Sequence, residues 1–443
     1  MFHQFMNKIY NQLPVVLQEY AISFYAKKRN LKYRYNSFYF ESLIELKKLE
    51  RNSELLIDYQ LKHLNDIIEY SLKHVLYYKN QEIYLNNSFK NFPIINKQVV
   101  KENFNAFLTD DAHVLKKSMK NNTSGSTGTS MNLFLTPKTT GIERADINAF
   151  RARSGYQYGD SVASFIGRKI MDFNQNEPPF WRYNKVDNQL IFSYWHLSIK
   201  TISSYIEKLI EFKPKFIHGY PSFIMLIAEY ILNKKITINK VDAIFTSSEN
   251  LMTHQRQVIE KAFKTKVFDR YGSAEMLISA SQCEFGQYHV NPMLGYLEII
   301  DNHIIGTTFH NYAMPLIRYD MGDISEFELS KCECGRITPI IRKPDGRLED
   351  VVVSKDGKKF GRLDHLFKNV PDLIECQIIQ EDFEHLTIKA KSHSPYNVLE
   401  KSIKKAVFDK LGNTFSIKVE KVKEIERAKS GKLRFVISKI QKK

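Results

Sequence analysis

The chain has 443 residues, more than one compact core usually holds, so we expect at least two domains. Hydrophobic residues make up 43% and charged residues 26%, which excludes a disordered or collagen-like chain. No apolar run approaches the roughly 18–20 residues of a bilayer-spanning helix, and residues 1–20 lack the layout of a secretory signal. Four cysteines are too few for a disulfide framework, so we expect a cytoplasmic protein.

The net charge of +16 is concentrated at the C-terminal end. Residues 400–443 contain 14 Lys and Arg against 5 Asp and Glu, whereas the other 399 residues contain 51 against 44. Such a basic module suits a nucleic acid, an anionic lipid or a nucleotide, or it is simply a solvated surface. No zinc-finger, basic-zipper or RNA-recognition signature accompanies it, so we expect no nucleic-acid partner.

Residues 1–110 are expected to be mainly helical. Six apolar residues recur there at helical spacing and predict one buried helix face: Leu55, Ile57, Leu61, Leu64, Ile67 and Ile68. The opening residues 1–39 mix aromatic side chains with five basic ones, Lys27, Lys28, Arg29, Lys32 and Arg34. This segment either lies on an anionic membrane, at its inner face, or packs on its own domain.

Residues 111–347 alternate short apolar strands with helices. We expect strands at residues 131–135, 216–218, 241–245 and 266–269, and helices at residues 202–212, 223–232 and 256–263. This repetition predicts an α/β domain with mainly parallel sheets.

Residues 348–443 have a different pattern. Alternating strands containing Leu386, Ile388 and Ala390, and then Ile417 and Val419, flank an apolar helix face. The order β–β–α–β predicts a small C-terminal α+β domain.

The strongest local signal is the loop Thr123-Ser124-Gly125-Ser126-Thr127-Gly128-Thr129-Ser130. Its glycines let the backbone approach an anion, and its hydroxyl and N–H groups can cradle phosphate oxygens. No Gly-Lys-Ser/Thr follows, so it is not a Walker A loop. Taken alone, the same octet is equally compatible with a flexible linker.

Four further polar motifs fall at predicted strand ends and turns. Tyr271-Gly272-Ser273-Ala274-Glu275 offers a ring for a base and a carboxylate for Mg²⁺. Arg318-Tyr319-Asp320-Met321-Gly322-Asp323 offers a carboxylate for ribose hydroxyls. Gly346-Arg347-Leu348-Glu349-Asp350 begins the small domain, and Lys429-Ser430-Gly431-Lys432-Leu433-Arg434 puts a lysine on a turn. Each one alone is an ordinary turn.

In this order the motifs resemble the adenylate-forming superfamily of acyl-CoA synthetases, peptide-synthetase adenylation domains and luciferases. The resemblance spans nearly the whole chain and is closest to the phenylacetate-CoA ligase branch, with its CapK-like proteins of capsular polysaccharide biosynthesis. His218-Gly219-Tyr220-Pro221-Ser222 and Thr246-Ser247-Ser248-Glu249 add to it, as does Ile9-Tyr10-Asn11-Gln12-Leu13-Pro14. The implied fold has a helical part at residues 1–110, an α/β adenylation core at residues 111–347 and a small mobile domain at residues 348–443.

The resemblance also implies residue roles. The loop at residues 123–128 would hold the β- and γ-phosphates of ATP, Glu275 would hold Mg²⁺, and Glu349 would be the hinge. The implied nucleotide-binding residues are Thr123, Ser124, Gly125, Ser126, Thr127, Gly128, Ser248, Glu249, Tyr271, Gly272, Asp323 and Arg347. The implied catalytic residues are Lys432, Glu275 and Thr127. Three positions depart from the family: Ala274 replaces a hydroxyl, Glu349 replaces aspartate, and Ser247-Ser248 stands where a glycine is common.

The implied activity is that of an AMP-forming ligase, which activates a carboxylic acid with ATP and passes the acyl group to coenzyme A. A sugar, an amine or a carrier in polysaccharide biosynthesis is the alternative acceptor, and a non-catalytic scaffold is the alternative function. Because a carboxylate is already ionised, its attack on the α-phosphorus needs no general base. We therefore expect His196, His218 and His310 to be pocket or structural residues. The acid and the oligomeric state stay open.

Two features lie outside this scheme. Cys283, His289, Cys332 and Cys334 offer three thiolates and an imidazole, the ligand set of a closed tetrahedral Zn²⁺ site. Similar positions occur in members of the resembling family; the alternative is free buried thiols, which we expect for Cys376. The aromatic segments at residues 180–183 and 194–196 either line an acyl pocket or belong to the core.

Overall fold

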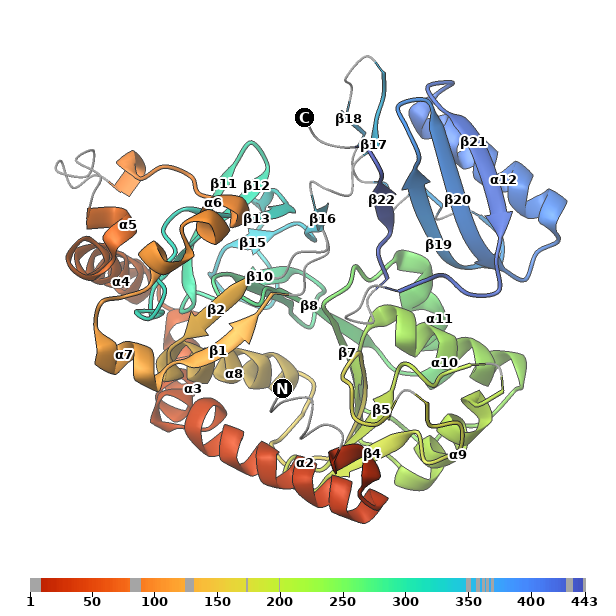
Figure 1. Cartoon of the computed structure of the whole chain (residues 1–443), viewed down its shortest axis with the longest axis horizontal. Helices are drawn as coiled ribbons and strands as arrows, with labels where there is room; N and C mark the ends of the chain where they lie inside the picture. Colours follow the sequence, from red (N-terminus) through yellow and green to blue (C-terminus); the bar gives the residue numbers. More distant parts are fainter. Residues whose placement is uncertain are drawn as a thin grey trace. The chain divides into compact units, whose positions relative to one another are not determined.

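The computed structural model describes residues 9–79, 89–123, 131–172, 174–198, 200–347, 352–355, 359–360, 363, 366–367, 370–427 and 433–440. The chain divides into two compact units, each made of separate stretches of sequence. One unit contains residues 1–19, 161–267 and 345–443, and the other contains residues 20–160 and 268–344. Figure 1 labels their helices and strands.

Most of the described helices of the unit formed by residues 20–160 and 268–344 precede its sheets. They are α2 (Val15–Arg29), which begins just before the unit, η1 (Asn30–Arg34), α3 (Ser37–Leu49), α4 (Ser53–His74), α5 (Leu76–Lys79), η3 (Phe89–Asn91), α6 (Lys97–Glu102), η4 (Phe104–Phe107), α7 (Ala112–Lys117) and α8 (Pro137–Ala152). Five begin after a residue whose side chain accepts a backbone N–H of the first turn, which explains where they start. These caps are Asn36, Asn52, Asn96, Asp111 and Thr136.

Helix α4 buries a different face from the predicted one. Leu64, Ile67 and Ile68 are buried as expected, together with Leu56 and Tyr59. The other three predicted residues are exposed: Leu55, Ile57 and Leu61. The prediction was wrong for these three because α4 carries apolar residues on more than one side. The buried stripe includes Leu56, Tyr59, Leu64 and Ile67, which recur every three to five residues.

The strands of this unit pair antiparallel. The hairpin β1 (Met119–Asn122) and β2 (Asn132–Leu135) stands by itself. Strands β8 (Val267–Gly272), β9 (Ser279–Gln282), β10 (Tyr288–Val290), β15 (Ile340–Ile341) and β14 (Phe327–Glu328) follow one another across a sheet. Strands β11 (Gly295–Ile300), β12 (His303–Thr308) and β13 (Tyr319–Ile324) form a second sheet.

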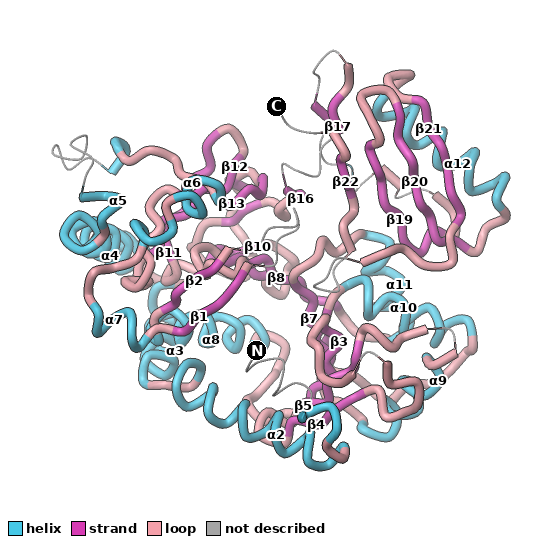
Figure 2. The backbone as a smooth tube through the Cα atoms, viewed as in Figure 1, coloured by secondary structure: helices cyan, strands magenta, loops and turns pink. Residues whose placement is uncertain are grey.

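Residues 161–267 form the parallel part of the fold. Strands β5 (Gln189–Ser193), β3 (Val162–Ile166), β6 (Phe216–Gly219) and β7 (Ala243–Ser247) pair parallel, with β4 (Trp181–Asn184) antiparallel at the edge. Helices α9 (Ile202–Phe212), α10 (Pro221–Asn233) and α11 (Thr253–Phe263) connect or follow them. Helices α10 and α11 pack side by side (Figure 2). The predicted strands and helices of this region are confirmed to within a few residues.

The C-terminal stretch has its own core. Strands β21 (Ser416–Lys421), β20 (His385–Ser392), β19 (Leu373–Gln380) and β22 (Val436–Ser438) form a sheet in that order, and α12 (Tyr396–Leu411) lies between β20 and β21 in sequence. Short strands β16 (Asp345–Arg347), β17 (Val352–Val353) and β18 (Lys359–Phe360) precede it. Leu399 and Ile403 of α12 are fully buried with Ile388 of β20. The predicted β–β–α–β order is confirmed, with β22 as a further strand.

These parts together give a mixed α/β protein with a small α+β portion at its C-terminal end, so the predicted fold class is confirmed. Parallel pairing joins β5, β3, β6 and β7 within residues 161–267. The domain boundaries at residues 110 and 347 stay a prediction. Within the described residues, no helix has the length and apolar character that crossing a bilayer requires.

Candidate active site

In sequence, the Ser/Gly/Thr loop lies between strands β1 and β2 of the hairpin. The backbone N–H of Thr123 donates to the carbonyl of Met131 at 2.9 Å, and the N–H of Met131 donates to Oγ1 of Thr123 at 3.0 Å. Thr123 therefore ties together the two ends of the loop. Ser124, Gly125, Ser126, Thr127 and Gly128 lie outside the described residues, and their role in phosphate binding stays a prediction.

The turn after β8 is contacted by the hairpin and by β13. The side-chain amide of Asn121 on β1 donates to the carbonyl of Ala274 at 3.4 Å. The hydroxyl of Tyr319, the first residue of β13, donates to Oε1 of Glu275 at 3.5 Å. The carboxylate proposed to hold Mg²⁺ thus lies beside the base of the loop proposed to hold phosphates.

Asp323 lies on β13, close to the end of β8. The hydroxyl of Tyr271 donates to Oδ2 of Asp323 at 2.8 Å, which fixes the direction of this carboxylate. The glycine before it, Gly322, has a positive φ of 72° and lets the strand turn sharply there. The structure therefore brings together three predicted motifs: the hairpin with Thr123, the turn with Tyr271, Gly272 and Glu275, and the strand with Asp323.

A buried ion-pair network supports this end of β8, and sequence reasoning did not identify it. Arg270 donates to Asp146 at 2.6 Å and to Glu143 at 2.9 Å, and both carboxylates come from α8. Ser279 and Asn291 each donate to Asp146 at 2.8 Å. Burial opposes ionisation of Asp146, but Arg270 and these hydrogen bonds hold its pKa below the usual value. The available signal was the spacing of Glu143 and Asp146, three residues apart beside buried apolar residues.

The other predicted adenine-binding residues, Ser248 and Glu249, follow β7 in the unit that contains residues 161–267. Oε2 of Glu249 accepts the backbone N–H of Ser222 at the start of α10, at 3.2 Å. Its Oε1 accepts the backbone N–H of Leu433 at 2.9 Å. Glu249 therefore holds the residue next to Lys432 in sequence, a contact that no sequence pattern indicated. Its role toward adenine stays a prediction.

Ser248 has a positive φ of 71°, a conformation that costs most residues about 1–2 kcal/mol and glycine almost nothing. This explains physically why a glycine suits the position at which the sequence departs from the family. We expect Ser248→Gly to raise the free energy of unfolding by up to about 1 kcal/mol. Ser247→Gly, inside the extended strand β7, is the matched control and should lower it by roughly 0.5–1 kcal/mol. Thermal melts check both; the opposite order would contradict the argument.

Three predicted residues receive no side-chain description. Arg347 ends β16, but its side chain is among those left undescribed. Glu349 and Lys432 lie outside the described residues. The roles of Arg347 in nucleotide binding, of Glu349 as the hinge and of Lys432 as the adenylation lysine stay predictions.

The C-terminal sheet contacts α10 through charged groups. Arg427 is ion-paired with Glu375 on β19, and both side chains are almost fully buried. The same guanidinium lies 5.3 Å from the ring centre of Tyr194. On α10, burial raises the pKa of Glu229 to about 8, although Lys391 opposes the shift. A cluster of ionisable groups therefore surrounds this contact.

This cluster predicts a pH dependence. Because the folded pKa of Glu229 exceeds its unfolded value, the folded protein binds the extra proton between about pH 4.5 and 8, and stability falls as the pH rises through that window. We expect Glu229→Gln to remove this slope and to gain on the order of 2 kcal/mol at pH 8. Urea denaturation at pH 5 and pH 8 checks this. Glu207→Gln, at an exposed position of α9, should leave the slope unchanged.

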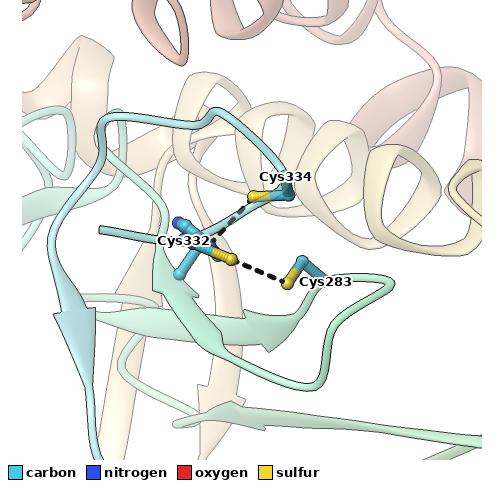
Figure 3. A group of neighbouring side chains, drawn as sticks. Cys283, Cys332 and Cys334 are labelled. Carbon is cyan, nitrogen blue, oxygen red and sulfur yellow. Dashed lines mark hydrogen bonds between the residues drawn. The ribbon is translucent and has the colours of Figure 1, made fainter. Parts of the chain in front are cut away.

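Cys283, His289, Cys332 and Cys334 form one cluster. Their ligand atoms all lie within 4.8 Å of one another. Sγ of Cys283 is 3.6 Å from Sγ of Cys332, and Sγ of Cys334 is 3.2 Å from Nε2 of His289. Ligands of a tetrahedral Zn²⁺ lie about 3.3–3.8 Å apart, so the spacing suits one ion. Figure 3 shows the three thiols pointing toward one another from two loops.

The surroundings of this Cys/His cluster also suit a metal. Nδ1 of His289 lies 3.2 Å from the hydroxyl of Thr338, which orients the ring so that Nε2 faces the thiols. Burial, with Arg153 and Arg336 nearby, lowers the pKa of His289 to about 4, so the imidazole is neutral at physiological pH. Gly335 follows the last cysteine with a φ of 71° and turns the chain back. The donor set and its geometry fit Zn²⁺.

His196 and His310 both hydrogen-bond within the protein. His196 lies 2.7 Å from the Ser193 hydroxyl through Nδ1 and 3.0 Å from the Asp172 carbonyl through Nε2. Nε2 of His310 lies 2.7 Å from the hydroxyl of Tyr59. Phe180 is buried and its ring stacks on His196. These contacts favour the structural interpretation for both histidines and place part of the first aromatic segment in the core.

Known proteins resemble the chain in sequence and in structure. A family model described as the CapK C-terminal domain matches residues 352–439. Protein CapK of Staphylococcus aureus is 28% identical over 459 residues, which cover 98% of this chain and 100% of CapK. 2-Hydroxyisobutyryl-CoA ligase, solved in the postadenylation state with 2-HIB-AMP, superposes with a TM-score of 0.64 at 17% identity, covering 87% of this chain and 89% of that one. Its open conformation with 2-HIB-AMP and CoA gives a TM-score of 0.51 at 17% identity, covering 87% and 91%. The chain is therefore similar to CapK along nearly its whole length, and its fold is that of 2-hydroxyisobutyryl-CoA ligase.

Proposed function

We propose that this protein is an AMP-forming ligase that activates a carboxylic acid with ATP and then transfers the acyl group to an acceptor, most simply coenzyme A. The observation that carries the proposal is the convergence of three motifs on one site. Tyr271 hydrogen-bonds Asp323, Tyr319 hydrogen-bonds Glu275, and Asn121 ties the loop-bearing hairpin to the same turn. An aromatic ring, two carboxylates and a glycine-rich loop are the groups that a nucleotide requires.

The first step joins the acid to AMP. A carboxylate oxygen of the substrate attacks the α-phosphorus, the bond to the bridging oxygen breaks, and pyrophosphate leaves with that oxygen. Mg²⁺ at Glu275 would neutralise charge on the phosphates. The loop amides and Lys432 would stabilise the charge on the α-phosphate, while Asp323 would hold the ribose hydroxyls.

The second step releases AMP. The thiol of coenzyme A gives up its proton to solvent and its sulfur attacks the acyl carbon. The acyl–phosphate bond then breaks, and AMP leaves as its phosphate anion. Support for coenzyme A comes from the structural neighbour, which was solved with 2-HIB-AMP and CoA. A sugar, an amine or a carrier in polysaccharide biosynthesis, which the resemblance implies, is the alternative acceptor.

An ATP–pyrophosphate exchange screen across aryl, fatty, hydroxy and amino acids tests the first step. We expect exchange with one class of acid, and hydroxylamine should trap the activated acyl group. Adding coenzyme A, amino sugars or a carrier protein to the active acid then identifies the acceptor by mass spectrometry. No exchange and no ATP binding would instead support the non-catalytic scaffold.

We also propose that Cys283, His289, Cys332 and Cys334 hold a structural Zn²⁺. Four protein ligands leave no open position, so the ion would join two loops and take no part in the reaction. The 3.6 Å separation of the Cys283 and Cys332 sulfurs is too long for a disulfide, whose sulfurs lie about 2 Å apart.

A further inference from the structure

Helix α2 and the turn that follows it expose an unusual set of side chains. Tyr20 is 66% exposed, Phe24 73% and Tyr25 56%, and Leu31 in the following turn is 68% exposed. Large apolar residues scattered singly are normal on a protein surface, but four within twelve residues are not.

The arrangement within α2 is helical. Tyr20, Phe24 and Lys27 recur at intervals of three or four residues and therefore share one side of α2. Ile22 and Ala26, on the opposite side, are 7% and 2% exposed and pack against the protein. The helix is thus apolar on its inner face, as usual, and apolar and basic on its outer face. A helix that faces only water carries polar residues there, so the outer face is suited to contact something apolar.

The charge of the segment has one sign. Residues 20–34 contain five basic residues and no acidic one. Lys27, Lys28 and Lys32 are exposed beside the aromatic rings. Nζ of Lys32 lies 4.8 Å from the ring centre of Tyr33, and the guanidinium carbon of Arg29 lies 5.6 Å from that of Tyr25. Cations and aromatic rings alternate along one surface strip.

We infer that the outer face of residues 20–34 binds the surface of an anionic lipid bilayer. The rings of Tyr20 and Phe24 and the side chain of Leu31 would enter the boundary between headgroups and acyl chains, while the three exposed lysines contact lipid phosphates. Aromatic and basic residues on one face are the composition of interfacial helices, and aromatic rings favour this depth. A protein partner would need its own acidic, apolar groove, whereas an anionic bilayer offers both features everywhere. The inference does not depend on the proposed ligase activity.

Sedimentation with vesicles tests this directly. We expect the full chain to bind vesicles of equal parts phosphatidylglycerol and phosphatidylcholine, to bind pure phosphatidylcholine far less, and to lose affinity as salt rises. Each lysine near an anionic surface contributes about fivefold, so Lys27→Gln, Lys28→Gln and Lys32→Gln combined should weaken binding roughly 100-fold. The matched control combines Lys401→Gln, Lys404→Gln and Lys405→Gln on exposed positions of α12, with the same change in net charge. An equal loss in the control would overturn the inference, because it would show attraction by total charge alone.

A second variant tests the apolar contribution. Phe24→Ser with Leu31→Ser removes two exposed side chains that are not part of the core, so circular dichroism and melting temperature should stay unchanged. Binding to the anionic vesicles should fall at least about tenfold, because burial of apolar area is lost. Unchanged binding, absence of binding by the unmodified protein, or a change in sedimentation without lipid would each contradict a bilayer as the partner of this face.

Discussion

Lys432→Ala should abolish adenylate formation, lowering its rate by roughly 10²-fold or more, because a positive charge on the α-phosphate is lost in the transition state. ATP binding should stay nearly intact, since Tyr271, Asp323 and the loop remain. Consumption of chemically supplied acyl-AMP should also survive, because the small domain of the resembling family moves this lysine away for the second step. Pyrophosphate exchange and single-turnover acyl transfer measure the two steps separately.

The neighbouring Lys429→Ala is the control and should lose little, as expected of a surface lysine. Glu249 adds a structural comparison, because its carboxylate accepts the N–H of Leu433, directly after Lys432. Glu249→Gln keeps an acceptor at this position and should therefore cost less adenylation than Glu249→Ala. Equal losses in both half-reactions for Lys432→Ala would show that the lysine was assigned wrongly.

Cys332→Ser should reduce bound zinc from about one ion per chain to well below one and lower the melting temperature by at least about 5 °C. Loss of one of the four ligands lowers the affinity for the ion, and the two loops that the ion joins then lose their cross-link. Plasma emission spectrometry and a thermal melt measure the two effects on the same preparation.

Cys376→Ala is the matched control. Cys376 is buried in the C-terminal core and is not a member of the Cys/His cluster. Its variant should keep full zinc content, although the small cavity lowers stability modestly. If the purified protein contains no zinc and Cys332→Ser leaves the melting temperature unchanged, the proposal of a structural metal is wrong.

Sequence patterns predicted the strands and helices between residues 202 and 269 and those around Ile388 because burial is strongly periodic there. Ile202 to Phe212 form the predicted helix α9, and the alternation around Ile388 matches strand β20. The pattern failed on α4, where Leu55 and Leu61 share the apolar character of the buried residues but not their side of the helix. The pattern of apolar residues predicts that a helix buries one face. Which face is buried depends on the elements that pack against the helix.

The candidate site was predicted unevenly for a related reason. Tyr271 and Asp323 could be singled out because each stands in a motif of unusual residues, and the structure then joins them by a hydrogen bond. The pairing of Arg270 with α8 could not, because Asp146 lies 124 positions away in sequence and the spacing of Glu143 and Asp146 does not reveal their partner. The backbone contact between Glu249 and Leu433 was likewise invisible, since any residue except proline offers the same N–H.

Gly272 shows how the buried network limits change in the chain. A Cβ at this position would lie 2.8 Å from Nη1 of Arg270, a guanidinium that cannot swing aside because Asp146 and Glu143 hold it. The buried Arg270 guanidinium therefore requires a glycine at position 272, independently of any ligand that binds the outer surface of the turn. Larger residues should be accepted at position 272 only after Arg270 has been shortened, and shortening Arg270 would leave two buried carboxylates unneutralised. Positions 143, 146, 270 and 272 can therefore vary only as a set.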